Sequence, residues 1–495
     1  MKKFISVPII VVSLFIFLLE TPYAIAKIGR GSPEYRAISG VSMGGYGAMN
    51  IGLSHPEEFK TIACLGGPLD MTYLLKYLEV DMLGDFDNTP SYPSRGTRIK
   101  MLKDLVISFG NPVYYNPLST YYPPRINSDN ANVATTLLNF KDGALNPDGS
   151  LPVITFEDSS PGNWIEVLLA LDLNGNGKRN VGERVIRQFH EPFIDANGNG
   201  MYEPGETYSD VGLDGVAGTG DYGEGDGKFT YSPHRDNFLA QDPLTHLKNL
   251  PSSTLQNLNL YIDAGTQDEF EFNIHAENFV EALQSKGLPV RIENGFPESI
   301  PDVSHFWDQN VYVRYEGGHV GFNEEDIGNI IQEAIAGVKG AITVANRFAT
   351  LFAFVSDRFP NGDYGTNFYE LYEYPSEMGV VIFDSPSLNR KVQFGVYLPP
   401  GYWRSHYNYY PVLYLMGGYN MSVEGLANEW VQLALDYLIY TEEMQKMIIV
   451  VVDGENYKNG RGHFFVNQID KERGDNFMDY FFDVMDYVDE RAKTR

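Results

Sequence analysis

The sequence predicts an α/β fold with a central, mostly parallel sheet, and three observations support this expectation. Residues 412–415 and 447–452 are uninterrupted apolar runs, which is typical of strands buried on both faces of a sheet. Residues 276–286 carry apolar side chains at helical spacing. A glycine-rich turn at residues 40–45 joins an apolar strand to a segment that favours a helix. With 495 residues, 43% of them hydrophobic, the chain can bury a large core.

The other elements follow from the same patterns. Short apolar runs bounded by turn residues predict strands, and apolar residues at helical spacing predict helices. The expected strands are residues 35–38, 61–65, 164–171, 257–263, 311–315, 380–383, 392–398, 412–415 and 447–452. The expected helices are residues 48–53, 276–286 and 324–358, the last as one helix or as two broken near Gly340.

The first 26 residues have the pattern of a secretory signal. Lys2 and Lys3 precede an apolar run at residues 4–19, and Ala24-Ile25-Ala26 follows it as a small-residue cleavage site. We therefore expect cleavage after Ala26, a secreted or periplasmic protein and no stable membrane span afterwards. An uncleaved signal anchor is the alternative.

Charge and cysteine content narrow the classes of partner. The formal net charge of −28 would repel nucleic acid and anionic lipid, so neither is an expected partner. The single cysteine, Cys64, lies in the expected buried strand 61–65 and has no second thiol for an internal disulfide. The sequence leaves the oligomeric state open.

The glycine-rich turn has the pattern of a nucleophile elbow. Ser42 lies between Gly40 and Gly44, whose small size allows a sharp turn between a strand and the following helix. Such a turn presents Ser42 at the helix N-terminus and leaves the Met43 amide free to stabilise an oxyanion. A glycine-rich turn without chemistry is the alternative. In the expected structural context, the pattern favours a serine hydrolase.

An activated serine needs a base and a carboxylate that orients the base. Asp268 follows the strand expected at residues 257–263, and His319 follows the strand expected at residues 311–315 among glycines that permit a tight turn. The order serine, aspartate, histidine is the order of α/β-hydrolases. Asp263 and His305 are the competing acid and base.

These segments together resemble the esterase D-like family of α/β-hydrolases. The matching residues are 36–48 around the serine, 55–59 after it, 265–270 for the acid, 317–319 for the base, and 384–388, 396–402 and 410–418 in the C-terminal part. The resemblance implies an α/β-hydrolase sandwich. It also implies that Ser42, Asp268 and His319 form a catalytic triad, with Met43 and either Gly418 or Tyr419 as oxyanion donors.

Two features depart from the family pattern. The C-terminal segments resemble strands that precede the serine in the family, so the chain looks circularly permuted; a gene-assembly artefact and an exchange of half-domains between two chains are the alternatives. Gly417-Gly418 also replaces the usual His-Gly of the oxyanion loop. Backbone donors survive that change, and Asn420 would serve as polar support or as a turn residue.

The resemblance and the composition divide the chain into six parts. These are a signal peptide (1–26), a hydrolase part with the nucleophile elbow (27–155), a calcium-binding insertion (156–236), a hydrolase part with the acid and base (237–358), a linker (359–378) and a hydrolase part equivalent to the family's N-terminal strands and oxyanion loop (379–495).

Two segments of the insertion match the twelve-residue calcium loop, with oxygen ligands at positions one, three, five and twelve and glycine at six. The expected ligands are Asp172, Asn174, Asn176, Lys178 (carbonyl), Asn180 and Glu183 in the first loop, and Asp195, Asn197, Asn199, Met201 (carbonyl), Glu203 and Glu206 in the second. We expect structural calcium in non-helical loops, because the spacing is too short for paired helix-loop-helix units. A solvated glycine-rich loop is the alternative.

The sequence thus favours an exported serine carboxylic-ester hydrolase that forms an acyl-enzyme. Its expected substrate is a small-molecule ester or an acylated or feruloylated polysaccharide. The alternatives are an acyltransferase of the same fold and a non-catalytic, calcium-dependent binding protein on an esterase scaffold.

Overall fold

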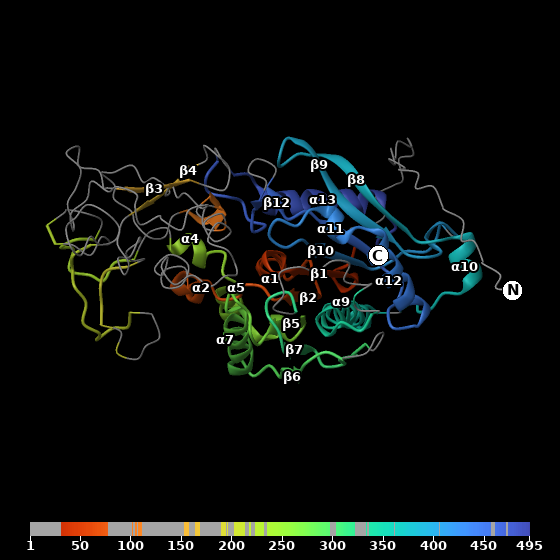
Figure 1. Ribbon diagram of the computed structural model, residues 1–495, viewed down its shortest axis with the longest axis horizontal. Coiled ribbons are helices and arrows are strands. Elements are labelled where there is room, and N and C mark those ends of the chain that lie inside the picture. The colour runs from red at the N-terminus through yellow and green to blue at the C-terminus, as the bar shows by residue number, and fades with distance from the viewer. Residues whose placement is uncertain are drawn as a thin grey trace.

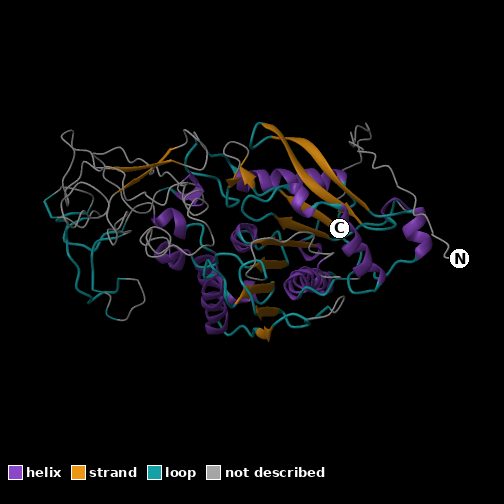
Figure 2. Ribbon diagram, in the orientation of Figure 1, coloured by secondary structure: helices purple, strands orange, loops and turns teal. Residues whose placement is uncertain are grey.

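A sheet of nine strands runs through the computed structural model of the protein (Figures 1 and 2). The structure describes residues 31–77, 101, 104–105, 107–110, 153–157, 164–168, 190–194, 196, 202–212, 217–218, 223–231, 235–297, 303–321, 333, 336–360, 362–404, 406–456, 461–471 and 474–495. The signal peptide predicted at residues 1–26 lies outside these ranges.

The sheet is parallel except at one edge. Its strand order is β6 (Arg291–Asn294), β7 (Asn310–Tyr315), β5 (Asn259–Gly265), β2 (Thr61–Leu65), β1 (Arg36–Val41), β10 (Val412–Met416), β11 (Ile448–Val452), β9 (Arg390–Leu398) and β8 (Glu377–Ser385). All neighbours from β6 to β11 are parallel, whereas β9 pairs antiparallel with both β11 and β8. The central, mostly parallel sheet expected from the apolar runs is confirmed.

Segments from the two ends of the chain meet in the middle of the sheet. The β1 strand pairs in parallel with β10, with Arg36 opposite Val412 and Gly40 opposite Met416. Arg495 lies beside the residues that precede β1, because the Ser32 amide donates to the Arg495 carbonyl at 2.9 Å. The elbow strand is therefore supported on one side by a strand that follows it by more than 370 residues.

Helices cover both faces of the sheet (Figure 1). The described helices are η1 (Pro33–Tyr35), α1 (Met43–Ser54), α2 (Met71–Tyr77), α4 (Arg235–Leu239), α5 (Pro243–Asn249), α6 (Ser252–Leu255), α7 (Phe272–Ser285), α9 (Lys339–Arg358), α10 (Phe368–Glu373), η4 (Tyr402–Arg404), α11 (Val423–Leu426), α12 (Glu429–Tyr440) and α13 (Phe477–Arg491). Two short antiparallel pairs lie outside the main sheet: β3 (Val153–Glu157) with β4 (Trp164–Leu168), and β12 (Glu455–Asn456) with β13 (Arg461–Gly462). None of these described helices is both long and apolar enough to cross a membrane.

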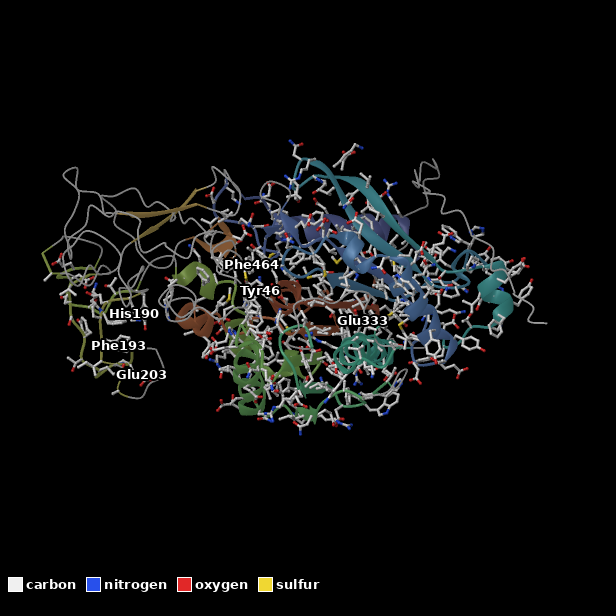
Figure 3. The ribbon with its side chains drawn as sticks, in the orientation of Figure 1. Tyr46, His190, Phe193, Glu203, Glu333 and Phe464 are labelled. Atoms are coloured by element: carbon white, nitrogen blue, oxygen red, sulfur yellow. The ribbon has the colours of Figure 1, made fainter. Side chains whose placement is uncertain are left out.

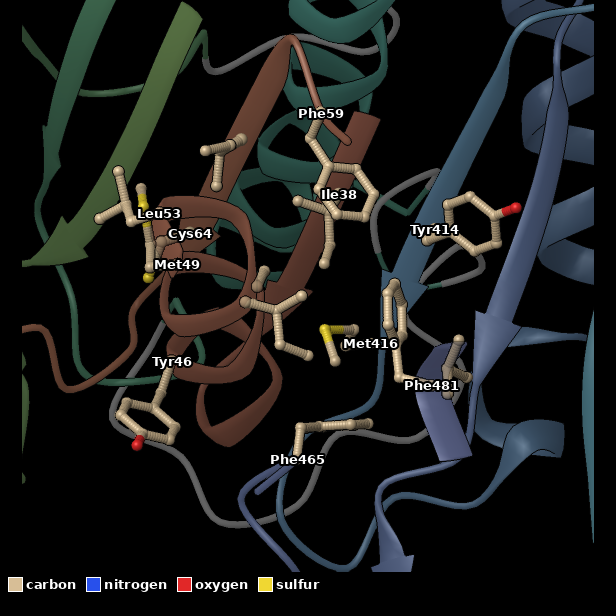
Figure 4. Packing of buried hydrophobic residues seen from close by; sticks show 14 of the residues in the cluster. Ile38, Tyr46, Met49, Leu53, Phe59, Cys64, Tyr414, Met416, Phe465 and Phe481 are labelled. Carbon is tan, nitrogen blue, oxygen red and sulfur yellow. The ribbon is translucent and has the colours of Figure 1, made fainter. Parts of the chain in front are cut away.

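Alternation along each strand divides the core between the two faces. On β10, Tyr414 and Met416 join one apolar cluster while Leu413 and Leu415 join the other, as expected when successive side chains point to opposite faces. The first cluster includes side chains of α1, α5, α7 and α13, and the second includes side chains of α9 and α12. Figure 4 shows Tyr414 and Met416 among residues of the first cluster, together with Phe481.

Element boundaries differ modestly from the sequence expectations. The described part of the segment expected to be helical at residues 324–358 contains α9, which begins at Lys339, beside the break expected near Gly340. Residues 359–378, which we expected to be a linker, contain α10 and the start of β8. Cys64 is buried in β2, as its apolar surroundings indicated.

The described residues between 190 and 231 include a cluster of half-buried aromatic rings. Phe229 stacks on Tyr202 with ring centroids 3.9 Å apart, and His190 and Phe193 pack against Phe229. Figure 3 shows His190, Phe193 and Glu203 at the end of the molecule away from Tyr46 and Phe464. Ring packing and hydrogen bonds, rather than long helices or strands, order the described part of this segment.

Candidate active site

Ser42 occupies the turn between β1 and α1, as the elbow pattern predicted. Its φ of 56° and ψ of −119° are unusual for a residue with a side chain. Its amide donates to the Leu65 carbonyl at 2.7 Å, and its carbonyl accepts the Tyr46 amide at 3.0 Å. These bonds hold the backbone in a conformation that projects the side chain from the end of the strand.

Two glycines make this turn possible. A Cβ atom at Gly40 would lie 2.3 Å from the backbone of Gly44, and a Cβ atom at Gly44 would lie 2.2 Å from the Met416 carbonyl oxygen. Both distances are far below van der Waals contact, and both involve backbone atoms that are fixed by the sheet and the helix. The glycines of the motif are thus required by close approach between β1, α1 and β10.

Ser42, His319 and Asp268 form one hydrogen-bonded chain. His319 Nε2 lies 2.8 Å from Ser42 Oγ, and His319 Nδ1 lies 2.9 Å from Asp268 Oδ2. The side chains of His319 and Asp268 are 8% and 0% exposed, whereas Ser42 is half-buried. The three residues come from three different strand-end turns, and the sheet brings these turns together at one edge.

Several contacts fix the orientation of the imidazole. The rings of Phe270 and Phe272 meet the His319 ring edge-on, with centroids 5.0 and 5.3 Å away. The second carboxylate oxygen of Asp268 accepts the Phe270 amide at 2.9 Å, and the His319 amide donates to Glu269 at 2.8 Å. The loop that carries the acid therefore also holds the base.

The turn after β10 lies next to Ser42. A Cβ atom at Gly418 would be 3.7 Å from Ser42 Cβ. The Met421 amide donates to the Gly418 carbonyl, and Asn420 has a φ of 59°. These features define a β-turn with a left-handed third residue, a position that asparagine tolerates. Asn420 is therefore a turn residue, one of the two roles expected for it.

The candidate oxyanion donors lie on both sides of Ser42. Met43 is the first residue of α1, so its amide has no partner within the helix. Tyr419 is anchored through its hydroxyl, which donates to Asp104 Oδ2 at 2.6 Å. Gly462 packs against both residues, because a Cβ atom there would lie 2.5 Å from Met43 Sδ and from Tyr419 Cδ2.

The competing acid and base have other partners. Both carboxylate oxygens of Asp263 accept hydrogen bonds from Arg347, at 2.6 and 2.8 Å. His305 is bonded through Nδ1 to Asp357 at 3.2 Å and through Nε2 to Glu443. The hydrogen bond that the Asp357 carboxylate accepts from His305 is the main cause of a rise in the pKa of His305 to about 9. The structure thus pairs Asp263 and His305 with groups other than Ser42.

Sequence reasoning missed the groups behind His319. Tyr315, Glu269 and Arg347 each contact the backbone of His319. Glu269 and Tyr315 lie within four residues of predicted site residues, so their proximity was a usable signal. Arg347 lies in the middle of an amphipathic helix, where a lone arginine is ordinarily exposed.

Most of the expected calcium ligands lie outside the described residues. This applies to all six ligands of the first loop and to Asp195, Asn197, Asn199 and Met201 of the second. Glu206 is described, and its carboxylate accepts the amides of Ala196 at 2.9 Å and of Glu203 at 2.8 Å. Within the described ranges, no three His, Cys, Asp or Glu side chains are grouped closely enough to hold a metal ion.

The chain belongs to the Esterase family, described as "Putative esterase", which matches residues 18–309 and 385–480. Together with the nine-stranded sheet, this membership shows an α/β-hydrolase fold and the class of carboxylic-ester hydrolases. A search of curated proteins found no match.

Similar solved structures include a ferulic acid esterase and two PHB depolymerases. The ferulic acid esterase is 22% identical, with a TM-score of 0.23, and the match covers 25% of this chain and 46% of that protein. A PHB depolymerase from Penicillium funiculosum is 10% identical with a TM-score of 0.34, and one complexed with an R3HB trimer is 9% identical with a TM-score of 0.32. Each depolymerase match covers 86% of this chain and 80% of the other.

Proposed function

We propose that the protein is an exported serine carboxylic-ester hydrolase whose triad is Ser42, His319 and Asp268. The observation that carries the proposal is the hydrogen-bonded chain from Ser42 Oγ through His319 to Asp268, with the serine held at a φ of 56°. A glycine-rich turn without chemistry would need neither the base nor the buried carboxylate.

The geometry suits acyl transfer in two steps. His319 Nε2 takes the proton of Ser42 Oγ as the oxygen attacks the ester carbonyl carbon. The Met43 amide and an amide of Gly418 or Tyr419 stabilise the oxyanion. Collapse of the intermediate breaks the bond to the alcohol, which leaves with the proton from His319. Water then attacks the acyl-enzyme by the same route and releases the acid.

The substrate and location proposed here rest on the sequence. The signal pattern at residues 1–26 favours an ester met outside the cytoplasm, and acylated or feruloylated polysaccharides are the substrate class that we propose. The net charge of −28 favours a neutral polymer over nucleic acid or an anionic surface.

The chain order is also part of the proposal. We propose a circular permutation in which residues 379–495 supply strands that precede the serine in the family. The pairing of β1 with β10 and the two-segment family match support it. Gly31 and Arg495 approach closely: a Cβ atom at Gly31 would lie 2.6 Å from the Arg495 carbonyl oxygen. In the family order that a permutation implies, residues 487–495 run directly into residues 34–40, so this close approach is expected.

We further propose structural calcium in residues 172–183 and 195–206, on the strength of two full loop patterns and the oxygen-rich ligands that calcium prefers. If calcium orders this segment, a chelator should lower the melting temperature of the protein, and excess calcium but not magnesium should restore it. An unchanged melting temperature in chelator would contradict this proposal.

The test of the catalytic proposal is hydrolysis of short-chain aryl esters by residues 27–495. Wild type should turn over the ester, and Ser42→Ala should lose this activity. Ser54→Ala is the matched control, since Ser54 ends the same helix and is exposed. Turnover by Ser42→Ala equal to that of wild type, or no turnover by well-folded wild type, would contradict the proposal.

A further inference from the structure

A buried ion pair lies directly behind the catalytic base. Arg347 of α9 donates from Nε to Asp263 Oδ2 at 2.8 Å and from Nη2 to Asp263 Oδ1 at 2.6 Å. The side chains are 2% and 0% exposed. Such two-point geometry fixes the guanidinium plane as well as its position.

The third nitrogen of the guanidinium contacts the main chain of His319. Arg347 Nη1 donates to the His319 carbonyl oxygen at 3.2 Å, and the Tyr315 hydroxyl donates to the same oxygen at 3.0 Å. A Cβ atom at Gly66 would lie 2.9 Å from Arg347 Nη2 and 3.7 Å from His319 Nδ1. The guanidinium and the imidazole thus both border the space that a side chain at residue 66 would occupy.

Burial and the partner charge act in opposite directions on the pKa of each member of the pair. Burial lowers the pKa of the Arg347 guanidinium, but the Asp263 carboxylate raises it, and the resulting pKa lies above its usual value. Burial raises the pKa of Asp263, and Arg347 opposes that rise. A buried pair of this kind adds little net stability compared with apolar residues of the same volume, so stability alone does not account for its place behind His319.

We propose that Arg347 and Asp263 form a positioning pair for the catalytic base. Arg347 fixes the main chain of His319, and Asp263 cancels the charge that Arg347 would otherwise place beside the imidazole. This inference rests on the proposed function, and it assigns a role to α9, the helix that connects the His319 side of the chain to the C-terminal strands.

Three other titratable groups lie near His319: Asp268, Glu269 and His275. Asp268 accepts from Nδ1 and Glu269 accepts from the backbone amide. His275 of α7 is buried, and burial lowers its pKa to about 4, so it adds no positive charge near neutral pH. Glu269 is unchanged in every variant compared below, so differences between those variants report on Arg347 and Asp263.

The experiment compares Arg347→Met, Arg347→Lys and Asp263→Asn. The readout is kcat per active site, with sites counted by a fluorophosphonate so that a misfolded fraction does not enter. Misplacement of the base should lower kcat of Arg347→Met by about 10²-fold with little change in KM. Arg347→Lys should fall between this variant and wild type, because one ammonium group does not span Asp263 and the His319 carbonyl as a guanidinium does.

Arg314→Met is the matched control. Arg314 is on β7, and it makes the same two-point contact with Glu277, at 2.7 and 2.6 Å. Both of these side chains are more than a third exposed, at 35% and 42%. Exposed ion pairs contribute little to the free energy of unfolding. This variant should keep the wild-type kcat and melting temperature.

The pH dependence separates positioning from mere structural support. Asp263→Asn leaves the Arg347 charge unopposed, which disfavours the His319 cation and moves the acid limb of kcat/KM to lower pH. Arg347→Met removes a positive charge, so the acid limb of its kcat/KM should fall at the same pH as that of wild type or at a higher pH. The acid limb of Asp263→Asn should therefore fall at a lower pH than that of Arg347→Met.

Two outcomes would overturn this inference while leaving the triad intact. One is a kcat per titrated site for Arg347→Met within about threefold of wild type. The other is an acid limb for Asp263→Asn that does not lie below that of Arg347→Met. Failure of the proposed function is distinguishable, because Ser42→Ala would then retain turnover whatever the Arg347 variants do.

Discussion

Two histidines of this protein are bonded on both ring nitrogens, yet their surroundings give them opposite chemistry. His319 lies between the Asp268 carboxylate and the Ser42 hydroxyl. His305 lies between two carboxylates, those of Asp357 and Glu443. Both were candidates for the base in the sequence.

The difference shows how partners decide the role of an imidazole. Asp357 and Glu443 raise the pKa of His305 to about 9, so the ring is a cation at neutral pH and has no lone pair with which to accept a proton. At His319 one nitrogen faces a carboxylate and the other faces an uncharged hydroxyl, which is the arrangement that general-base catalysis needs. His305 instead ties the loop before β7 to the end of α9 and to the turn after α12.

The largest expected effect separates these two histidines. His319→Ala should lower kcat by about 10⁶-fold, because the serine loses its base. His305→Ala should keep kcat, because its ring contacts neither Ser42 nor Asp268. Aryl ester hydrolysis per folded protein measures both variants. A loss of activity in His305→Ala alone would exchange the roles assigned to the two residues.

The next effect concerns the carboxylates. Asp268→Asn should lower kcat on the order of 10⁴-fold, since an amide at this position favours the wrong tautomer of the base. Glu443→Gln is its counterpart at His305, and it should leave kcat unchanged while it lowers the pKa of His305. Turnover by Asp268→Asn close to wild type would show that another group orients His319.

The smallest effect is on stability. The folded pKa of His305, about 9, exceeds its ordinary value of 6.5, so its contribution to stability is complete below about pH 6.5 and is lost as the pH rises through about 9. The difference in melting temperature between wild type and His305→Gln should therefore be larger at pH 6 than at pH 10. The contribution is modest, because the pair is partly exposed. A difference that does not depend on pH would contradict the assigned pKa.

The elbow and the strands could be predicted because their signals are local. Ser42 lies between two glycines that a tight turn requires, and the buried strands are continuous apolar runs. His319 and Asp268 could be proposed from their positions after strands, since the carboxyl ends of parallel strands meet at one edge of the sheet.

The remaining features depend on contacts that sequence spacing does not encode. Nothing local distinguishes Arg347 from the exposed arginines of other helices, and only its burial against Asp263 reveals its place behind the base. His305 was the competing base in the sequence, and its two carboxylate partners come from α9 and from the turn after α12. Partners that are distant in sequence therefore give His305 its other role and place Arg347 behind His319.

The central claim is that Ser42 is a nucleophile activated by His319, and covalent labelling tests it most directly. Residues 27–495 treated with a fluorophosphonate and digested should carry one label, on the peptide that contains Ser42. Labelling should be as fast in His305→Ala as in wild type, much slower in His319→Ala and absent in Ser42→Ala. A label on another residue, or equal labelling rates for His319→Ala and wild type, would contradict the account.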